Sequence, residues 1–164
     1  MTRETEFWIT VALAVLAILL MAAAERAWGE EAGGDERPNL RPLLDAIRQV
    51  ESSDLENPPR GDGGLARGPY QIHRVYWIDA VEHVPDLGGR YEDVDDREYA
   101  ECIVLAYWHR HEPAALAAGD FETLARCHNG GPNWRRKPAT KAYWTRVKEA
   151  LTQRAQRDRE NGGE

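Results

Sequence analysis

The stretch that decides the fold is VESSDLENPPRGDGGLARGPYQIHRVYWID, residues 50–79. A helix is expected to end at Glu51, because apolar residues recur at helical spacing before it and this period disappears after it. The proline- and glycine-rich sequence that follows predicts a loop, with a short hairpin or turn around Asp62. Residues 68–72 are expected to form a short extended or turn segment that leads into the next helix.

Two carboxylates, Glu51 and Asp62, flank this loop. Glu51 lies in the last turn of its helix, at the edge of the apolar stripe, where desolvation and the negative end of the helix dipole both disfavour its ionised form. A raised pKa is what a general acid requires, and an acid facing a second carboxylate across one cleft is the arrangement that glycoside hydrolysis uses. The residues alone leave alternatives open: Glu51 as a solvated side chain at a fraying helix end, and Asp62 as a residue selected for turn geometry.

The rest of the domain is predicted to be mostly helical. Apolar spacing, acidic N-caps and terminal glycines or prolines predict helices over residues 39–51, 73–84, 97–111, 121–128 and 138–156. The helix over residues 97–111 is expected to be central, with an inward face made of Tyr99, Cys102, Ile103, Ala106 and Tyr107. The expected inward face of the helix over residues 73–84 is Val75, Ile78, Val81 and Val84. The sequence therefore predicts an α+β fold, mostly α-helical, of about five helices with a small hairpin or irregular loop that carries the second carboxylate.

The two ends of the chain are expected to lie outside the folded domain. Residues 7–24 (FWITVALAVLAILLMAAA) carry no charge, reach the ~18-residue lower limit for a membrane span and end in small residues. They are predicted to be either a cleavable signal peptide or an uncleaved membrane anchor, and either one sends the remaining chain out of the cytoplasm. Residues 25–38 are predicted to be a linker, residues 39–156 the catalytic domain, and residues 157–164 a charged, disordered tail.

Composition narrows the possible partners. The 164 residues carry a net charge of -7 and no dense basic cluster, so we expect no nucleic-acid partner and no long-range attraction of acidic polymers. Six Trp and six Tyr against two Phe favour a sugar-binding protein, because an amphipathic ring can stack on a pyranose. Cys102 and Cys127 do not have metal-ligand spacing, so no metal or cofactor is expected; the two thiols are either buried and free or paired.

Four islands of sequence, in the same order, resemble the invertebrate-type (destabilase-like) lysozymes. They are Glu51-Ser52, GPYQIHRVYWID over residues 68–79, LARCHNGGP over residues 124–132, and Tyr143-Trp144. The resemblance implies a lysozyme-like fold and a muramidase that hydrolyses the β-1,4 bond between N-acetylmuramic acid and N-acetylglucosamine in peptidoglycan. It further implies a bacteriolytic, antibacterial enzyme that is monomeric and either secreted or periplasmic. If residues 7–24 are an uncleaved anchor, they would tether the enzyme to the membrane.

The resemblance also implies roles for individual residues. Glu51 matches the catalytic general acid. Asp62 aligns within one residue of the second carboxylate, the nucleophile or stabiliser of the oxocarbenium-like state. Asp54 and Glu56 are the alternative candidates for this second carboxylate. The sugar-binding residues that it implies are Tyr70, Gln71, Ile72, Tyr76, His128, Asn129 and Gly130. The dense disulfides of the family are not matched, and no serine follows Asp62, so the disulfides and the isopeptidase activity of some members are not expected.

Two other functions fit parts of the sequence. Lytic transglycosylases also use a glutamate followed by serine and then a glycine-rich segment that ends in glutamine, which residues 64–71 resemble. Such an enzyme would need Glu51 alone and would leave 1,6-anhydro sugar ends. A non-catalytic wall-binding module would keep the cleft but release no reducing ends.

Overall fold

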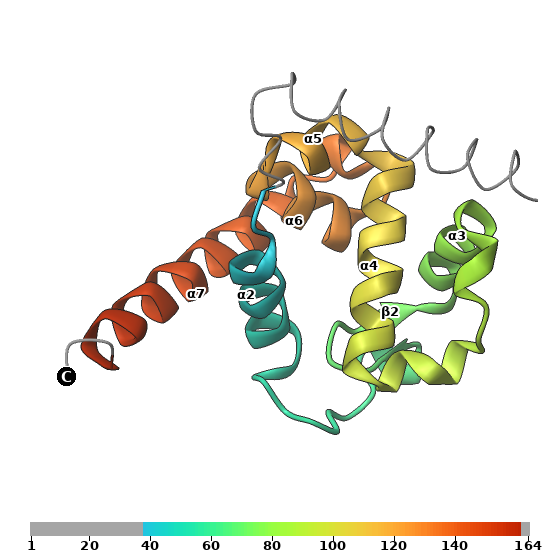
Figure 1. The fold of residues 1–164 in the computed structure, drawn as a ribbon, viewed down its shortest axis with the longest axis horizontal. Coiled ribbons are helices and arrows are strands. Elements are labelled where there is room, and N and C mark those ends of the chain that lie inside the picture. The colour runs from blue at the N-terminus through green and yellow to red at the C-terminus, as the bar shows by residue number, and fades with distance from the viewer. Residues whose placement is uncertain (1–37, 162–164) are drawn as a thin grey trace, which may run out of the picture. The chain divides into compact units, whose positions relative to one another are not determined.

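The computed structural model describes residues 38–161, which form six α-helices and one small antiparallel sheet (Figure 1). The α-helices are α2 (Arg41–Ser52), α3 (Arg74–His83), α4 (Arg97–His111), α5 (Pro113–Ala118), α6 (Phe121–Gly130) and α7 (Ala139–Asn161). The strands are β1 (Ala66–Arg67) and β2 (Ile72–His73), and the 3₁₀ turns are η1 (Asp62–Gly64), η2 (Pro85–Leu87), η3 (Tyr91–Asp95) and η4 (Trp134–Arg136). The predicted mostly helical α+β fold is confirmed.

The ends of the chain differ from the sequence-based expectation where they can be compared. The predicted signal peptide or membrane anchor (residues 7–24) lies outside the described residues, as does all but the end of the predicted linker. Among residues 38–161, no helix combines the length and the apolar character that a membrane crossing needs. The prediction of a disordered tail from residue 157 is wrong as far as Asn161, because α7 continues to that residue; Arg157, Arg159 and Glu160 in this last part have high helix propensity.

Helix α2 follows the sequence pattern closely. Pro42 lies in its first turn, where its missing N–H costs nothing, and Leu43 and Ile47 are fully buried. Ser53 ends the helix in the left-handed conformation (φ 54°), and its N–H donates to the carbonyl of Gln49. Helix α2 packs against α6 and α7, and Glu51 in its last turn lies 3.8 Å from His128 of α6.

Helix α4 is the central element, with α3 on one side and α2 and α6 on the other (Figure 1). Ile103, Val104 and Trp108 are fully buried, and Asp96 caps the helix by accepting a hydrogen bond from the Tyr99 N–H (2.8 Å). The predicted inward position of Cys102 is wrong, since this thiol is exposed. A helix packed on several sides has no single apolar stripe, so periodicity alone could not select the correct face.

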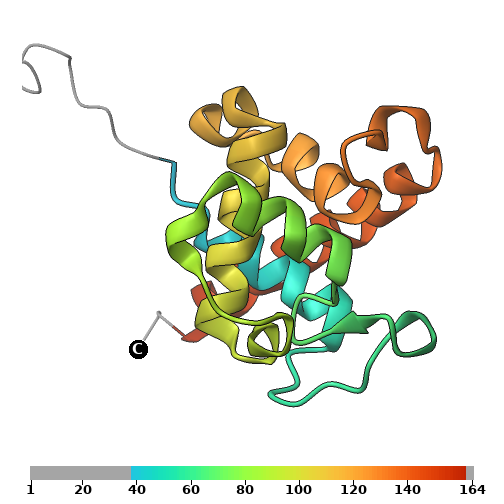
Figure 2. The same ribbon diagram turned by 90° about the vertical axis from the view of Figure 1, so that its right-hand side faces the viewer.

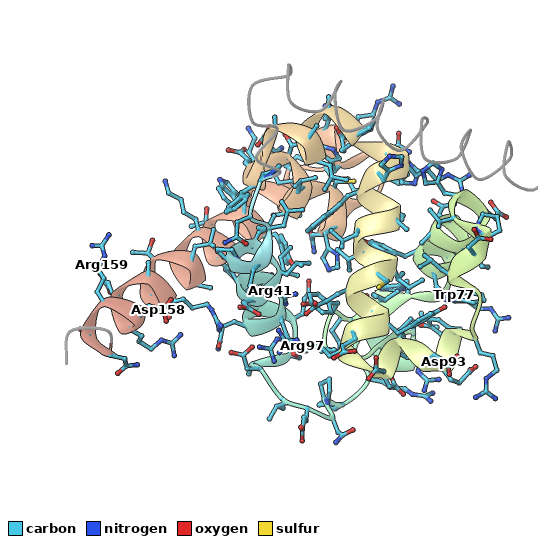
Figure 3. The ribbon with its side chains drawn as sticks, viewed as in Figure 1. Arg41, Trp77, Asp93, Arg97, Asp158 and Arg159 are labelled. Carbon is cyan, nitrogen blue, oxygen red and sulfur yellow. The ribbon has the colours of Figure 1, made fainter. Side chains whose placement is uncertain are left out.

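A buried ion-pair cluster ties α2 to α4. Glu101 accepts hydrogen bonds from Arg41 to both of its oxygens (2.7 and 2.6 Å) and from Arg97 Nε (2.9 Å). The Tyr70 hydroxyl donates to the same carboxylate at 2.8 Å. Figure 3 labels both arginines, one on α2 and one at the start of α4. Burial alone would raise the pKa of Glu101, but these donors outweigh it and lower the pKa to about 2.

The face that α3 turns inward agrees only in part with the prediction: Val81 and Val84 pack against the core as predicted, but Val75 does not. Val75 is 72% exposed, whereas Tyr76 and Ala80 are buried. The Tyr76 ring stacks on Tyr107 of α4, with ring centroids 3.6 Å apart and planes inclined by 12°. We attribute the rotation of the helix to this stacking, because burying two tyrosine rings outweighs burying one valine.

The short sheet forms the base of the loop that carries Asp62. Strands β1 and β2 pair antiparallel, with Ala66 opposite His73 and Arg67 opposite Ile72. A further bridge between Gly61 and Ala66 closes the turn around Asp62. The course of this green segment after α2 can be followed in Figure 2. Gly68 has a positive φ (71°), and a Cβ there would overlap the Val94 carbonyl, so this turn requires glycine.

Candidate active site

A polar pocket of about 380 Å³ opens where the end of α2, the Asp62 turn, the hairpin and helices α3, α6 and α7 meet. Segments from both halves of the described chain therefore build it. The residues that line it are Val50, Glu51, Gly61, Asp62, Ala66, Gln71, His73, Tyr76, His128, Asn129 and Arg146.

Glu51 lies at the inner side of this pocket, in the last turn of α2. Its side chain is only 20% exposed, and burial raises its pKa above the usual value. The Tyr143 hydroxyl and the Arg146 charge act in the opposite direction, and the negative charge of Asp62 adds to the rise. The net effect of this environment is to favour the protonated carboxyl, as the sequence pattern predicted.

Tyr143 is the neighbour of Glu51 on α7. Its side chain is buried, and within residues 38–161 its hydroxyl makes no hydrogen bond of normal geometry. Burial first, and then the nearby Glu51 charge, raise the pKa of this hydroxyl well above its usual value. The O–H therefore remains a potential donor that lies close to Glu51 and is not used by any other group of the described chain.

Asp62 has the opposite environment. Its side chain is 70% exposed, and one carboxylate oxygen lies 2.8 Å from Nε2 of His73 on β2. The residue has a positive φ (47°), which Asp tolerates better than most residues. The Asp62 carboxylate is thus open to solvent and hydrogen-bonded to a histidine, unlike the enclosed carboxyl of Glu51.

His128 lies below the pocket between two tyrosines. Its Nε2 is 3.2 Å from the Tyr70 carbonyl, which can only accept, so Nε2 carries the proton and Nδ1 accepts from the Tyr76 hydroxyl (3.2 Å). Burial lowers the pKa of His128 to about 4, so the ring is neutral near pH 7. The Nε2 atom is also 3.8 Å from a Glu51 oxygen, so a neutral ring, and not a positive charge, lies beside the carboxyl.

The structure brings together most of the predicted site residues, but not all. Glu51, Asp62, Gln71, Tyr76, His128 and Asn129 line the pocket.

Three predicted sugar-binding residues do not line it. Tyr70 and Ile72 are core residues with exposures of 0% and 1%, and the Tyr70 hydroxyl is used by Glu101. Gly130 is buried where a Cβ would collide with Trp134 and Thr140, so its role is close packing. The alternative candidate Asp54 is paired with Arg48 and Arg154 instead of facing the pocket. Glu56, the other alternative candidate, also lies outside the lining.

Two polar residues of the pocket, His73 and Arg146, were not predicted from the sequence. His73 lies on β2, whereas Gln71 precedes the strand with a positive φ (47°), so strand alternation could not have placed both side chains in the pocket. Arg146 follows Tyr143 by three residues on α7, a spacing that puts both on one side of a helix.

A mostly helical domain that presents a glutamate from a helix end and an aspartate from the following turn to one polar pocket has the architecture of the lysozyme-like class. The comparisons with known proteins agree with this class. Lysozyme of Ostrea edulis is 37% identical over 91 residues, which cover 54% of this chain and 64% of that protein. Invertebrate-type lysozyme 6 of Caenorhabditis elegans is 33% identical over 93 residues, which cover 52% of this chain and 67% of that protein. The chain belongs to the invertebrate-type lysozyme family.

A solved structure gives the same result. A chain in the crystal structure of Aeromonas hydrophila PliI in complex with Meretrix lusoria lysozyme superposes with a TM-score of 0.54 at 28% identity, covering 66% of this chain and 87% of that one. Lysozyme of Meretrix lusoria is itself 34% identical over 86 residues, covering 52% of this chain and 67% of that protein. No model of a known protein family matches the chain. The chain thus spans about two thirds of the length of the curated relatives that it matches.

Proposed function

We propose that this protein is a peptidoglycan hydrolase, a muramidase that cleaves the β-1,4 bond between N-acetylmuramic acid and N-acetylglucosamine. Family membership supports the reaction class. The observation that carries the proposal is the unequal environment of two carboxylates on one pocket: Glu51 is enclosed and its pKa is raised, while Asp62 is 70% exposed and bound to His73. Such a pair supplies an acid and an anion at the same pH.

In the proposed reaction, protonated Glu51 donates its proton to the glycosidic oxygen as the bond to the muramic acid anomeric carbon breaks. The Asp62 carboxylate attacks that carbon, or stabilises the positive charge that develops on it. Water then replaces Asp62 at the carbon and gives a proton back to Glu51, which restores the enzyme. The products are two sugar chains, one of which has a new reducing end.

Two neighbours of Glu51 support the proton transfer. The neutral His128 ring lies 3.8 Å from a Glu51 oxygen and is held in place by Tyr70 and Tyr76, so it packs beside the carboxyl without adding a positive charge that would stabilise the carboxylate. The Tyr143 hydroxyl can donate to the carboxylate that forms after proton transfer. We propose that Gln71, Tyr76 and Asn129 contact the sugars.

The substrate lies outside the cytoplasm, and the sequence of residues 7–24 predicts the same location for the enzyme, either secreted, periplasmic or tethered. Monomeric action is part of this proposal, since a glycan strand can enter a pocket built by one chain.

The decisive experiment is Glu51→Gln, assayed by the release of reducing ends from purified peptidoglycan. Loss of a positioned general acid is expected to lower kcat by ~10²–10⁴-fold. Glu56→Gln, an exposed glutamate outside the pocket, is the matched control and is expected to keep the wild-type rate. Turnover by Glu51→Gln at the wild-type rate would remove Glu51 as the acid.

Asp62→Asn separates the hydrolase from a lytic transglycosylase. A hydrolase that needs both carboxylates is expected to lose at least ~10²-fold and to release products with ordinary reducing ends. If Asp62→Asn keeps the wild-type rate and mass spectrometry finds 1,6-anhydro ends, the enzyme is a transglycosylase that uses Glu51 alone. If the wild-type protein binds peptidoglycan and releases no sugar ends of either kind, the protein is a binding module.

A further inference from the structure

Arg146 is the arginine of the pocket lining, and it has no partner of opposite charge in the described part of the chain. Its guanidinium lies over the Tyr143 ring, 5.4 Å from the centroid. No carboxylate oxygen of residues 38–161 lies within 4.0 Å of it. Many other arginines on the helices are paired in this way, among them Arg41, Arg48, Arg97, Arg126 and Arg154.

The charge of Arg146 works against the proposed chemistry when the pocket is empty. It stabilises the ionised form of Glu51 and so opposes the rise in pKa that burial causes. A general acid is weakened by such a neighbour. An anionic group bound to Arg146 would compensate its charge and would thereby raise the pKa of Glu51 further when substrate is present.

The proposed substrate carries suitable anions on only one of its two sugars. N-acetylmuramic acid bears a lactyl ether whose carboxylate is free in strands without stem peptides. Where a stem peptide is attached, the lactyl carboxyl is an amide, and the carboxylates belong to the peptide. N-acetylglucosamine is neutral. Arginine is the side chain best suited to hold a carboxylate, because its planar guanidinium donates two parallel hydrogen bonds.

We propose that Arg146 binds a carboxylate carried by the muramic acid residue of the glycan strand, and so selects that sugar over a neutral one beside Glu51. This inference rests on the proposed function, because it names the part of the same substrate that Arg146 recognises. The net charge of -7 gives no long-range attraction for an anionic polymer, so recognition has to be local, and Arg146 supplies it.

The test uses three soluble glycan substrates that differ in one group. The first has free lactyl carboxylates after removal of the stem peptides, the second has the same lactyl groups converted to neutral methylamides, and the third retains the stem peptides. The ratio of kcat/KM between each anionic substrate and the methylamide substrate is measured for wild type, Arg146→Gln, Arg146→Lys and the control Arg136→Gln, which changes an exposed arginine outside the pocket.

Arg146→Gln is expected to lower the ratio about tenfold, the effect of losing one charge-assisted hydrogen bond at a partly solvated site. Arg146→Lys is expected to retain part of the preference, since the charge remains and the bidentate geometry is lost. Arg136→Gln is expected to change nothing. If Arg146→Gln lowers the kcat/KM ratio for the free-lactyl strands, the lactyl carboxylate is the ligand. If it lowers the ratio for the stem-peptide strands alone, the peptide carboxylates are the ligand.

The inference is overturned if Arg146→Gln leaves both ratios unchanged, or if it lowers the rates on all three substrates equally, because a general electrostatic effect on Glu51 does not depend on the lactyl group. Calorimetry of the same strands with Glu51→Gln and with Glu51→Gln/Arg146→Gln measures binding without turnover. It therefore separates a failure of carboxylate recognition by Arg146 from a failure of the proposed reaction. If wild type binds the anionic strands preferentially through Arg146 and hydrolyses none of them, the recognition stands and the hydrolase assignment fails.

Discussion

Glu51 and Glu101 are two largely buried carboxylates in the same domain, with side chains 20% and 11% exposed. Burial raises the pKa of both, but the outcome differs. Glu101 receives hydrogen bonds from two arginines and a tyrosine, which lower its pKa to about 2, whereas the pKa of Glu51 stays raised. Burial alone therefore does not decide whether a carboxylate is held ionised, as Glu101 is, or has a raised pKa, as Glu51 has; the number of donors around it decides this.

The largest effect on stability is expected at the satisfied carboxylate. Glu101→Gln should lower the free energy of unfolding by about 2–3 kcal/mol near pH 7, because it weakens charge-assisted hydrogen bonds from Arg41, Arg97 and Tyr70. Urea unfolding measures this loss. The exposed Glu98→Gln on the same helix is the control, expected within about 0.5 kcal/mol of wild type.

The pH dependence of that loss follows from the direction of the shift. The folded pKa of Glu101 lies below the ordinary value of 4.5, so its contribution is present above pH 4.5 and disappears as the pH falls toward about 2. The difference between wild type and Glu101→Gln should shrink over the same interval. A difference that stays constant down to pH 2 would contradict the ion-pair explanation.

A smaller effect of opposite sign is expected at Glu51. Because its folded pKa is raised, its carboxyl contributes stability below the unfolded value, and this contribution is lost as the pH rises through the folded pKa. Glu51→Gln cannot ionise, so above that pH it should be more stable than wild type by on the order of 1 kcal/mol. Thermal unfolding of both proteins at pH 4 and pH 8 measures this difference. If Glu51→Gln and wild type differ by the same amount at both pH values, Glu51 lies in a solvated environment.

The smallest effect is expected from Tyr143→Phe, which removes a buried hydroxyl that has no hydrogen bond in the described chain. Stability should change by less than about 1 kcal/mol. The hydroxyl favours the ionised form of Glu51, so its removal should move the basic limb of the pH–activity profile to higher pH. Tyr107→Phe, a core tyrosine that does not act on Glu51, should leave the limb in place.

Of the two buried carboxylates, the sequence predicted Glu51, because its position follows from helical periodicity. The apolar stripe of α2 ends at Glu51, and that position alone indicated a carboxylate at the border between core and cleft. It could not predict Glu101, which occupies an inward position of α4 because partners from distant segments, Arg41 and Tyr70, satisfy it. Such compensation depends on tertiary contacts that no local pattern contains.

Aromatic residues show the same limit. Tyr70 and Tyr76 are six residues apart and both were predicted to bind sugar, but only Tyr76 lines the pocket, while Tyr70 lies in the core. Residue type indicates an amphipathic ring and does not say which end meets solvent. Arg146 was not predicted for a related reason: its spacing from Tyr143 puts the two on one side of α7, but only the tertiary fold brings that side to Glu51.

The two cysteines have a practical consequence. Cys127 is buried, and burial raises the pKa of its thiol to about 12, whereas Cys102 is free and exposed on α4. Thiolates are the species that alkylating reagents attack, so maleimide chemistry on the folded protein should attach one probe, at Cys102, with no engineered residue. A fluorophore or spin label can therefore be placed on the central helix of the wild-type chain, where it would report changes that occur when a glycan binds.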